Sequence, residues 1–366
     1  MLIAGAIAVA LYAAIFATKF MLASKYAATH REDEGLEGEI TVMQPILGGD
    51  PFLDEALRRN LGQPARFLWL VDEDDAEGQR VTGRLAEMAE GRVEIVLCPP
   101  PAPGANPKTA KLQRGLERLT TEYFAVLDDD AILSEGQLQR AMFGLKSSTL
   151  YTGLPCYLRG GNVWSSLVTH FVNNNSILTY LPPLPLVGPL SINGMFYVMR
   201  TADLRGMGGF TPIVRQLCDD YALAGLVRRN GGTIRQGTTP QFLNTTVPDA
   251  KHYVRLMHRW FVFANVLVRD QPARIQLLLT VLLGLPPLLL WIGALCPPLW
   301  LVLLIGRHLA LRRLQRRVFG VLPHLHVLMS IASQLLQPLH WLHACFQHTL
   351  RWRTRRIVVA TDGTFS

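Results

Sequence analysis

Charged side chains are scarce in this sequence. Asp, Glu, Lys and Arg make up 17% of the 366 residues, whereas hydrophobic residues make up 49%. A soluble domain usually carries about 25% charged residues, so the deficit indicates that lipid solvates part of the chain. Cysteine is also rare: the five cysteines are an odd number, and no two have CxxC spacing. This argues against a disulfide framework or a structural zinc site and favours packing roles in a reducing compartment.

The charge that is present is unbalanced, with a formal net charge of +8. Nucleic-acid binding is one explanation for a basic protein, but no nucleic-acid motif accompanies the charge. The basic residues instead crowd beside apolar runs, as in the stretches Arg307–Arg317 and Arg351–Arg356. Charge in such places is typical of residues that fix membrane topology and attract anionic lipid headgroups. We therefore expect a membrane partner and no nucleic acid.

The N-terminus carries the first long apolar run. Residues 2–18 have no charge, and with Lys19 reaching toward the interface the run extends to about residue 23, long enough to cross a bilayer. A cleaved signal peptide is the alternative, but it needs basic residues before the run, and here they follow it. We predict an uncleaved anchor over residues 1–23. The positive-inside rule then places the N-terminus outside and the following residues in the cytoplasm.

Residues 24–272 are predicted to form a cytoplasmic α/β domain. Apolar strand-like runs alternate with helix-like stretches, which is typical of a mostly parallel sheet with helices on both faces. The expected strands are Ile40–Ile46, Phe67–Val71, Val93–Leu97, Phe124–Leu127 and Ile192–Met199, and helices are expected at Asp54–Asn60, Ala76–Glu90 and Lys108–Leu119. Catalytic groups in such sheets lie beyond the carboxyl ends of strands, where Asp72 and Asp128 follow two of these runs.

The chain changes character after residue 272. Residues 275–305 carry no charge and contain two proline pairs, which predicts a transmembrane hairpin over 273–306 with its turn near Gly293–Pro298. Residues 307–350 begin with a basic loop and continue as an apolar stretch with many His and Gln residues. We interpret that stretch as an interfacial or re-entrant helix, which leaves residues 351–366 as a basic cytoplasmic tail.

An acidic cluster is the strongest chemical signal. Asp128, Asp129 and Asp130 directly follow a buried strand and precede another apolar run. Crowded carboxylates repel one another unless a cation neutralises them, and Mg²⁺ or Mn²⁺ prefers such oxygen ligands together with substrate phosphates. Asp128 and Asp130 fit the DxD pattern that holds a metal–diphosphate. An acidic turn after a strand is the simpler alternative.

Three further segments have both a functional and an ordinary interpretation. Asp219-Asp220 opens a helix-like stretch, so Asp220 is either a general base or part of a helix cap. Arg255–Trp260 offers basic and aromatic groups for a leaving diphosphate, or forms a juxtamembrane belt. Lys108 opens a helix after a Gly- and Pro-containing loop, where it either binds phosphate or is a solvated surface lysine.

Taken in this order, the segments resemble the ceramide glucosyltransferase family and its bacterial relatives, including the hopanoid-associated glycosyltransferases. The resemblance covers about residues 40–265. It rests on motifs that follow one another along the chain: Asp72-Glu-Asp74-Asp75, Gly104-Ala-Asn-Pro-Lys108, Asp128-Asp-Asp130, Gly153-Leu-Pro155, Asn193-Gly194-Met195, Asp219-Asp220-Tyr221 and Arg259-Trp260. The combination is far more specific than any one motif.

The resemblance implies a GT-A fold in which a Rossmann-like half binds a UDP-sugar. Asp128 and Asp130 would hold Mg²⁺ or Mn²⁺ on the departing diphosphate, and Asp220 would deprotonate the acceptor hydroxyl. A single base and one in-line displacement imply inversion at the sugar. The family's remaining donor contacts correspond to Asp72, Lys108, Asp128, Arg259 and Trp260, and its acceptor contacts correspond to Gly194, Met195 and Asp219.

Two positions depart from the family's pattern. Leu256 stands where the last motif has Gln or Arg, with Arg255 one residue early, which removes the usual diphosphate contact. Asp219 replaces the usual Glu and keeps its charge.

The acceptor is expected to be a membrane lipid. Residues 162–190 form an apolar, aromatic and proline-rich insert that could make an entrance at the membrane surface, or simply a helix that closes the core. Asn173, Asn174 and Asn175 lie in this insert and would face a sugar or a lipid headgroup. We expect ceramide as the acceptor in a bacterial inner membrane. Diacylglycerol, a hopanoid lipid, or a processive polysaccharide product are the alternatives, although three or so spans are few for a channel.

Overall fold

The computed structural model describes residues 1–30, 34–320, 326–347, 349–352 and 355–358. They divide into two compact units. The described residues of the first, which we call the sheet unit, lie within Arg31–Pro155 and Pro189–Thr246. Those of the second, the helical unit, lie within Met1–His30, Cys156–Gly188 and Val247–Asp362. Part of the predicted basic tail, residues 353–354 and 359–366, lies outside the described residues.

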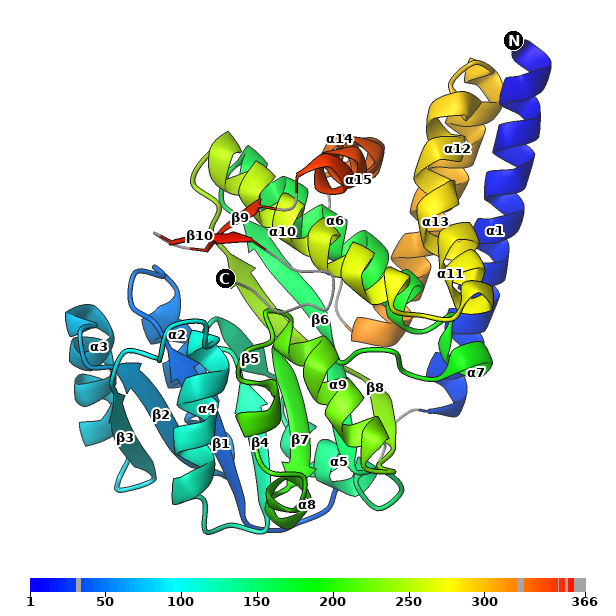
Figure 1. Ribbon diagram of the computed structural model, residues 1–366. Helices are drawn as coiled ribbons and strands as arrows, with labels where there is room; N and C mark the ends of the chain where they lie inside the picture. The colour runs from blue at the N-terminus through cyan, green and yellow to red at the C-terminus, as the bar shows by residue number, and fades with distance from the viewer. Residues whose placement is uncertain (31–33, 321–325, 348, 353–354, 359–366) are drawn as a thin grey trace. The chain divides into compact units, whose positions relative to one another are not determined.

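The sheet has eight strands in the order β3-β2-β1-β4-β7-β6-β8-β5 (Figure 1). Their bounds are β1 Ile40–Ile46, β2 Arg66–Asp72, β3 Val93–Cys98, β4 Tyr123–Leu127, β5 Ala131–Leu133, β6 Leu150–Gly160, β7 Phe196–Arg200 and β8 Ile234–Thr245. The first four strands in this order are parallel, and β7 pairs antiparallel with both β4 and β6. The predicted α/β class is confirmed: four of the five predicted runs form the parallel strands, and the fifth forms β7, which is antiparallel.

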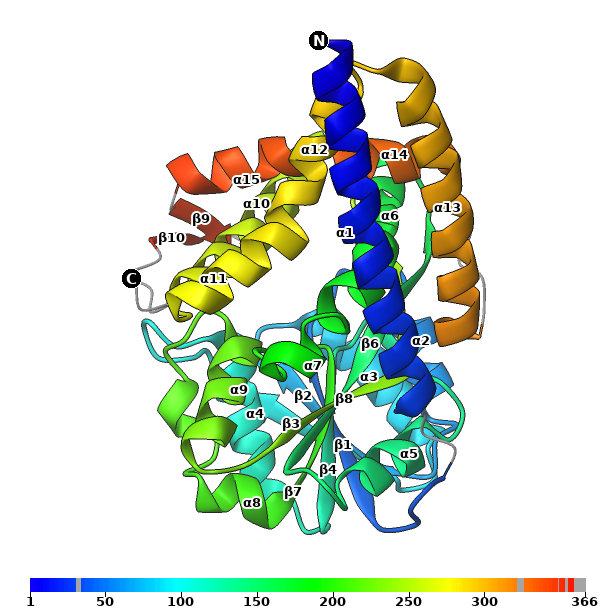
Figure 2. The same ribbon diagram turned by 90° about the vertical axis from the view of Figure 1, so that its right-hand side faces the viewer.

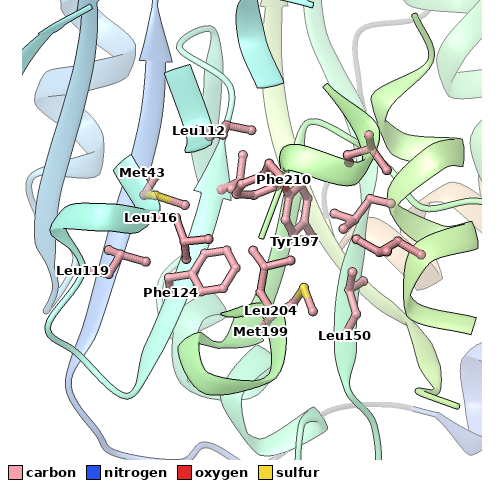
Figure 3. Close-up of a cluster of buried hydrophobic side chains, with 14 of the residues drawn as sticks. Met43, Leu112, Leu116, Leu119, Phe124, Leu150, Tyr197, Met199, Leu204 and Phe210 are labelled. Carbon is pink, nitrogen blue, oxygen red and sulfur yellow. The ribbon is translucent and has the colours of Figure 1, made fainter. Parts of the chain in front are cut away.

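The described residues of the sheet unit also contain six α-helices, which pack against its sheet. They are α2 Leu53–Asn60, α3 Ala76–Glu87, α4 Pro107–Arg118, α5 Gln137–Gly144, α8 Thr201–Gly206 and α9 Asp219–Arg229, with a short 3₁₀ turn at Thr211–Ile213. Figure 3 shows side chains of α4 packed against buried side chains of the sheet and of the loop after α8, including Leu116, Phe124, Tyr197 and Phe210, all of which are nearly inaccessible. This core fixes α4 against β1 and β2.

The carboxyl ends of the parallel strands meet at one edge of the sheet. Because Val42 and Met43 of β1 pair in register with Phe67 and Leu68 of β2, while β1 also pairs parallel with β4, the strands end side by side. Asp72 is the last residue of β2, and Asp128 directly follows β4. The topology thus brings residues from distant parts of the sequence to one edge.

In the helical unit, α1 Leu2–Thr29 and α13 Pro297–Phe319 run alongside α12 Leu285–Gly293 (Figure 2). α12 continues α11 Ala273–Leu279 through a π-helical turn, Thr280–Gly284. Among the described residues, Leu2–Thr29 and Ala273–Gly293 are the two helices that are long and apolar enough to cross a membrane. The chain reverses between Gly293 and Pro297.

The other helices of this unit are α6 Val163–Tyr180, α7 Leu184–Val187, α10 Ala250–Arg269, α14 Val327–Leu335 and α15 Gln337–Phe346, and β9 Thr349–Trp352 pairs with β10 Arg355–Val358. The Asn run lies on α6 and packs within the unit. The Asn173 side-chain oxygen accepts a hydrogen bond of 2.8 Å from the Tyr157 N–H, and its amide nitrogen donates one of 2.7 Å to the Tyr157 carbonyl. Asn174 donates to the hydroxyl oxygens of Ser330 and Ser333 on α14.

Candidate active site

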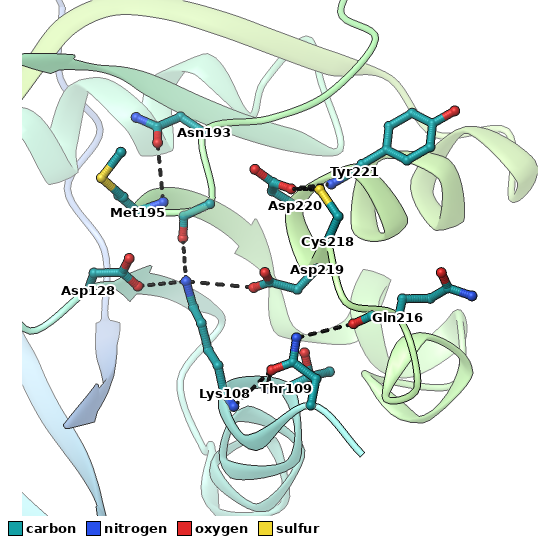
Figure 4. Close-up of polar contacts among 12 residues, drawn as sticks. Lys108, Thr109, Asp128, Asn193, Met195, Gln216, Cys218, Asp219, Asp220 and Tyr221 are labelled. Atoms are coloured by element: carbon teal, nitrogen blue, oxygen red, sulfur yellow. Dashed lines mark hydrogen bonds and ion pairs between the residues drawn. The ribbon is translucent and has the colours of Figure 1, made fainter. Parts of the chain in front are cut away.

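Lys108 connects four of the sequence motifs. Its ammonium Nζ lies 2.6 Å from Asp128 Oδ1 and 3.6 Å from Asp219 Oδ2, and it donates a hydrogen bond of 2.9 Å to the Gly194 carbonyl oxygen. Figure 4 shows the ammonium between these groups, which come from α4, the end of β4, the loop before β7 and the start of α9. The four segments that sequence reasoning singled out therefore meet at one point.

Local capping explains why Lys108 reaches this point. Asn106 is the N-cap of α4, and its side-chain oxygen accepts from the backbone N–H groups of Lys108 and Thr109. Its amide nitrogen donates to the backbone carbonyls of Gln216 and Leu217, just before α9. One fully buried side chain thus starts α4 and holds the loop that carries the Asp219-Asp220 pair.

The charges around Lys108 stabilise its protonated form. Burial alone would lower the pKa of Lys108, but the carboxylates of Asp128 and Asp219 outweigh it, and the pKa lies above its ordinary value. The side chains of all three residues remain about one-fifth to one-quarter exposed, at 21%, 26% and 23% respectively. Lys108 therefore stays protonated, and its one positive charge stands between two carboxylates at a partly exposed site.

The acidic cluster is divided by its contacts. Asp128 faces Lys108, and its backbone N–H donates to the Met195 carbonyl at 3.0 Å. Asp129 instead accepts a hydrogen bond of 2.7 Å from the Leu47 N–H. Burial raises the pKa of Asp129 to about 7 despite that bond. Burial, followed by the charges of Asp129 and Asp128, also raises the pKa of Asp130 well above its ordinary value.

Asp220 lies at the start of α9 with one carboxylate oxygen engaged. Its Oδ1 accepts a hydrogen bond from Cys218 Sγ at 2.8 Å and another from the Tyr221 N–H at 2.7 Å. Burial, followed by the neighbouring Asp219 carboxylate, raises the pKa of Asp220 to about 6, while the two hydrogen bonds act to lower it. A carboxylate with its pKa near the working pH is suited to general-base catalysis.

Cys218 is a contact that sequence reasoning missed. The expectation was a packing role, but the thiol donates to the candidate base. Burial raises the pKa of the Cys218 thiol well above its ordinary value, and Asp220 adds to this effect. The sulfur therefore stays protonated and keeps its hydrogen to donate. Its place two residues before the candidate base was the available signal.

Asp72 also has a partner that was not predicted. Its carboxylate lies 2.8 Å from Lys111 Nζ, and Lys111 also donates to the Ile46 carbonyl at 2.7 Å. Lys111 is almost fully buried. It stands three residues after Lys108 on α4, and this helical spacing puts both lysines on one face, which was the signal that could have found it.

Gly194 provides space beside Asp220. A Cβ atom at position 194 would lie 3.0 Å from the Asp220 Cβ and 3.6 Å from its Cγ, closer than most side-chain contacts. Asn193, which is fully buried, shapes the same turn through its side-chain oxygen, which accepts from the Met195 N–H. The absence of a side chain at Gly194 therefore allows Asp220 to keep its position.

Replacing Gly194 with alanine should push Asp220 out of place because of this contact. We expect Gly194→Ala to lower kcat about 10-fold or more with nearly unchanged UDP affinity, since a misplacement of about 1 Å can cost on the order of 10²-fold. Steady-state kinetics and UDP calorimetry measure the two effects. Gly83→Ala is the matched control, because nothing lies near the added Cβ there. Equal losses in both variants would contradict this role.

Arg259 and Trp260 lie on α10, in the helical unit. Trp260 stacks on Phe171 with 6.0 Å between ring centroids, and the neighbouring His258 Nε2 lies 2.9 Å from the Gln347 carbonyl. Leu256 is on the same helix. The assignment of Arg259 and Trp260 to the donor diphosphate stays a prediction.

Asp128 and Asp130, just beyond the end of β4, are the candidate ligands for a divalent cation that is shared with a diphosphate. Among the described residues, no three His, Cys, Asp or Glu side chains form a complete metal site. A Mg²⁺ or Mn²⁺ ion bound with substrate needs only one or two carboxylates, because phosphate oxygens and water complete its shell. The Asp128 carboxylate is paired with the Lys108 ammonium at 2.6 Å, so a bound cation would replace that ammonium as its partner.

Comparison with protein families gives one match that spans nearly the whole chain. The model of glycosyl transferase family 21 matches residues 5–365. The chain belongs to this family. The resemblance seen in the sequence motifs is thereby confirmed, and family 21 membership makes the protein a glycosyltransferase. A search of curated proteins found no match.

The GT-A fold of this family 21 protein is similar to that of one solved structure, and two others match more weakly. The mannosyltransferase PcManGT from Pyrobaculum calidifontis, in complex with GDP-Man and Mn²⁺, shares 18% identity at a TM-score of 0.51, covering 92% of this chain and 99% of that one. Glucosyl-3-phosphoglycerate synthase from Mycobacterium tuberculosis has 16% identity and a TM-score of 0.36, covering 61% and 78%. TarS 1-349 from S. aureus, in complex with UDP-GlcNAc, has 13% and 0.41, covering 89% and 98%.

Proposed function

We propose that this family 21 protein moves a sugar from a UDP-sugar to a hydroxyl group of a membrane lipid, with ceramide as the first acceptor to test. The meeting of Asp128, Gly194 and Asp219 at the Lys108 ammonium carries the proposal. This arrangement supports a pocket in which a cationic group and carboxylates flank a nucleotide diphosphate. The candidate base, Asp220, adjoins it on α9.

The proposed reaction is one displacement. The acceptor oxygen forms a bond to the anomeric carbon, while the bond from that carbon to the β-phosphate oxygen breaks and UDP leaves. The proton of the acceptor hydroxyl passes to the free carboxylate oxygen of Asp220. Because attack is opposite the leaving group, an α-linked donor yields a β-glycoside.

The donor contacts follow from charge. Lys108 would turn toward the diphosphate, to which its ammonium is a strong hydrogen-bond donor. Asp128 and Asp130 would hold Mg²⁺ or Mn²⁺, which supplies Lewis-acid stabilisation of the departing diphosphate. The presence of Mn²⁺ with GDP-Man in the mannosyltransferase of similar fold supports this choice. Asp72 would approach the uridine, held in place by Lys111.

The acceptor assignment depends on the helical unit. Its two apolar helices of membrane-spanning length support insertion into a bilayer. We propose that α1 and the α11–α12 segment cross the membrane, with the sheet unit in the cytoplasm. A lipid hydroxyl at the membrane surface is then the natural acceptor. Gly194, Met195 and Asp219 are the proposed acceptor contacts.

The direct test is an assay of the purified full chain in lipid nanodiscs. With Mn²⁺, one UDP-sugar and ceramide, we expect UDP release and a single glycosylceramide by mass spectrometry, with a β-linkage by NMR. Parallel nanodiscs that contain diacylglycerol or a hopanoid lipid in place of ceramide identify the acceptor. Polymeric product on a gel would indicate a processive synthase instead. No UDP release with any donor and acceptor would reject the proposal.

The pH profile should report Asp220 and its thiol partner. The base must be deprotonated, so kcat/KM should rise as pH increases through about 6, the pKa of Asp220. The hydrogen bond from Cys218 lowers that pKa. Cys218→Ala should therefore move the acidic limb to higher pH, and Cys218→Ser, which keeps a donor, should move it less. Identical limbs in all three proteins would rule out this role for the thiol.

A further inference from the structure

The chain after α10 has no acidic residue over a long stretch. Between Gln271 and Thr361 there are ten arginines and no aspartate, glutamate or lysine. Four of the arginines, at 312, 313, 316 and 317, fall in the last two turns of α13. None of these four takes part in the proposed sugar transfer, so the cluster requires its own explanation.

The four arginines stand next to an apolar strip on the same helix. Val302, Ile305 and Leu309 are 69%, 62% and 63% exposed, although they are fully apolar. Toward the carboxyl end of α13 there is an open hollow of about 840 Å³. It is lined by Leu309, Ala310, Arg312, Arg313, Arg316 and Arg317. The surface of α13 therefore changes from apolar to cationic within about one turn.

Like charges in this cluster repel one another. Arg312 and Arg316, and likewise Arg313 and Arg317, are four residues apart, where equal charges destabilise a helix. Within the part of the chain that the structure describes, no acidic side chain pairs with Arg313, Arg316 or Arg317. An anion bound in the hollow would offset this repulsion.

The depth of the cluster along α13 indicates which anion is available. α13 lies alongside α1: a Cβ atom at Gly5 would meet Cys296, and Arg307 donates to the Tyr12 hydroxyl at 2.7 Å. At a rise of ~1.5 Å per residue, Arg312 and Arg317 lie ~23 and ~30 Å beyond Pro297. A bilayer's hydrocarbon core is ~30 Å thick. With α1 across the membrane as proposed, Arg312 and Arg317 reach the phosphate layer on the cytoplasmic side of the bilayer.

We infer that the hollow at the end of α13 binds the phosphate of an anionic phospholipid, whose acyl chain lies along Val302, Ile305 and Leu309. The guanidinium group suits this ligand, because its planar array of donors binds phosphate oxygens in pairs. The inference rests on the proposed membrane insertion of α1, and is independent of the sugar-transfer site. The ligand is a structural lipid that is distinct from the acceptor, which needs a free hydroxyl rather than a phosphate.

Native mass spectrometry can test the lipid site. The full chain is released from nanodiscs that contain equal amounts of phosphatidylcholine and phosphatidylglycerol. We expect the unmodified protein to retain phosphatidylglycerol preferentially. Arg313→Gln/Arg316→Gln/Arg317→Gln should bind it on the order of 100-fold more weakly, since each surface arginine contributes about a factor of five to anionic-lipid binding. Inorganic phosphate should not displace the lipid, because it lacks the acyl chain.

Two further variants keep the test decisive. Arg59→Gln/Arg80→Gln/Arg118→Gln makes the same change in net charge with exposed arginines of the sheet unit, and should retain the lipid fully. Replacing Arg313, Arg316 and Arg317 with lysine keeps the charge, and this variant should retain part of the bound lipid. It serves as the comparison in case the glutamine variant folds poorly. Equal retention in the glutamine variant and the unmodified protein would overturn the inference, as would ready displacement by free phosphate.

Discussion

Replacing Asp220 with asparagine should lower kcat for sugar transfer by about 10³-fold while the affinity for UDP changes little. Positioned general bases contribute about 10²- to 10⁴-fold. Asparagine has the same shape, and its oxygen still accepts the hydrogen bonds that Cys218 and Tyr221 donate to Oδ1. The loss would therefore reflect proton transfer rather than a disturbed fold. Single-turnover kinetics with UDP-sugar and lipid acceptor measure the chemical step.

Asp219→Asn is the matched control for this prediction. Asp219 adjoins the base but pairs with Lys108, at 3.6 Å. Its loss should weaken acceptor binding and lower kcat by a much smaller factor than the Asp220 change. A larger loss of kcat in Asp219→Asn than in Asp220→Asn would reverse the two roles. Full activity of Asp220→Asn would remove the base assignment altogether.

Replacing Lys108 with methionine should weaken UDP binding by on the order of 100-fold, because hydrogen bonds to charged groups contribute about 1.5–3 kcal/mol each. The change also leaves Asp128 and Asp219 without their shared counter-charge. Calorimetric titration with UDP in the presence of Mn²⁺ measures the affinity. Lys108→Arg should recover little, because the forked guanidinium does not replace a compact ammonium between three acceptors.

Lys146→Met provides the comparison for the lysine variant. Lys146 is exposed and lies over the Phe143 ring, away from the strand ends. Its replacement should leave UDP affinity within about twofold, as expected for a surface site. If Lys108→Met also bound UDP normally, the contacts of Lys108 would be structural, and the donor-phosphate assignment would fail.

Much of the site could be predicted from the sequence, because its residues follow apolar strands or open helices. Asp128 directly follows β4 and Lys108 lies in the first turn of α4, so the local sequence pattern placed both. The meeting of Asp128 and Gly194 at the Lys108 ammonium could not be predicted, since Lys108 and Gly194 are 86 residues apart in the sequence. Lys111 and Cys218 were missed for the same reason: their partners depend on how loops pack, and no periodicity records that.

The fold, like the site, has parts that the local sequence pattern predicted and parts that depend on tertiary packing. The parallel strands β1 to β4 are short and mostly apolar, so their bounds were predicted within a residue or two. β8 was not predicted. Its sequence IRQGTTPQFLNT contains Gly237 and Pro240, which are typical of turns, and tertiary pairing overrides that local preference. β7 begins at Phe196 rather than Ile192, because Asn193 and Gly194 form the turn that faces Lys108.

The hydrogen bond between Arg307 and Tyr12 has a consequence for biosynthesis. The two residues are 295 positions apart, so at ~5–20 residues per second a ribosome needs on the order of 15–60 s to supply Arg307 after Tyr12. During that interval α1 lacks its contact with α13. The sheet unit has no such delay, because its last strand, β8, is complete at Thr245. Nascent chains stalled far enough beyond residue 246 for β8 to have left the ribosome should therefore already contain a protease-resistant sheet unit, while the helix pair forms only near the end of translation.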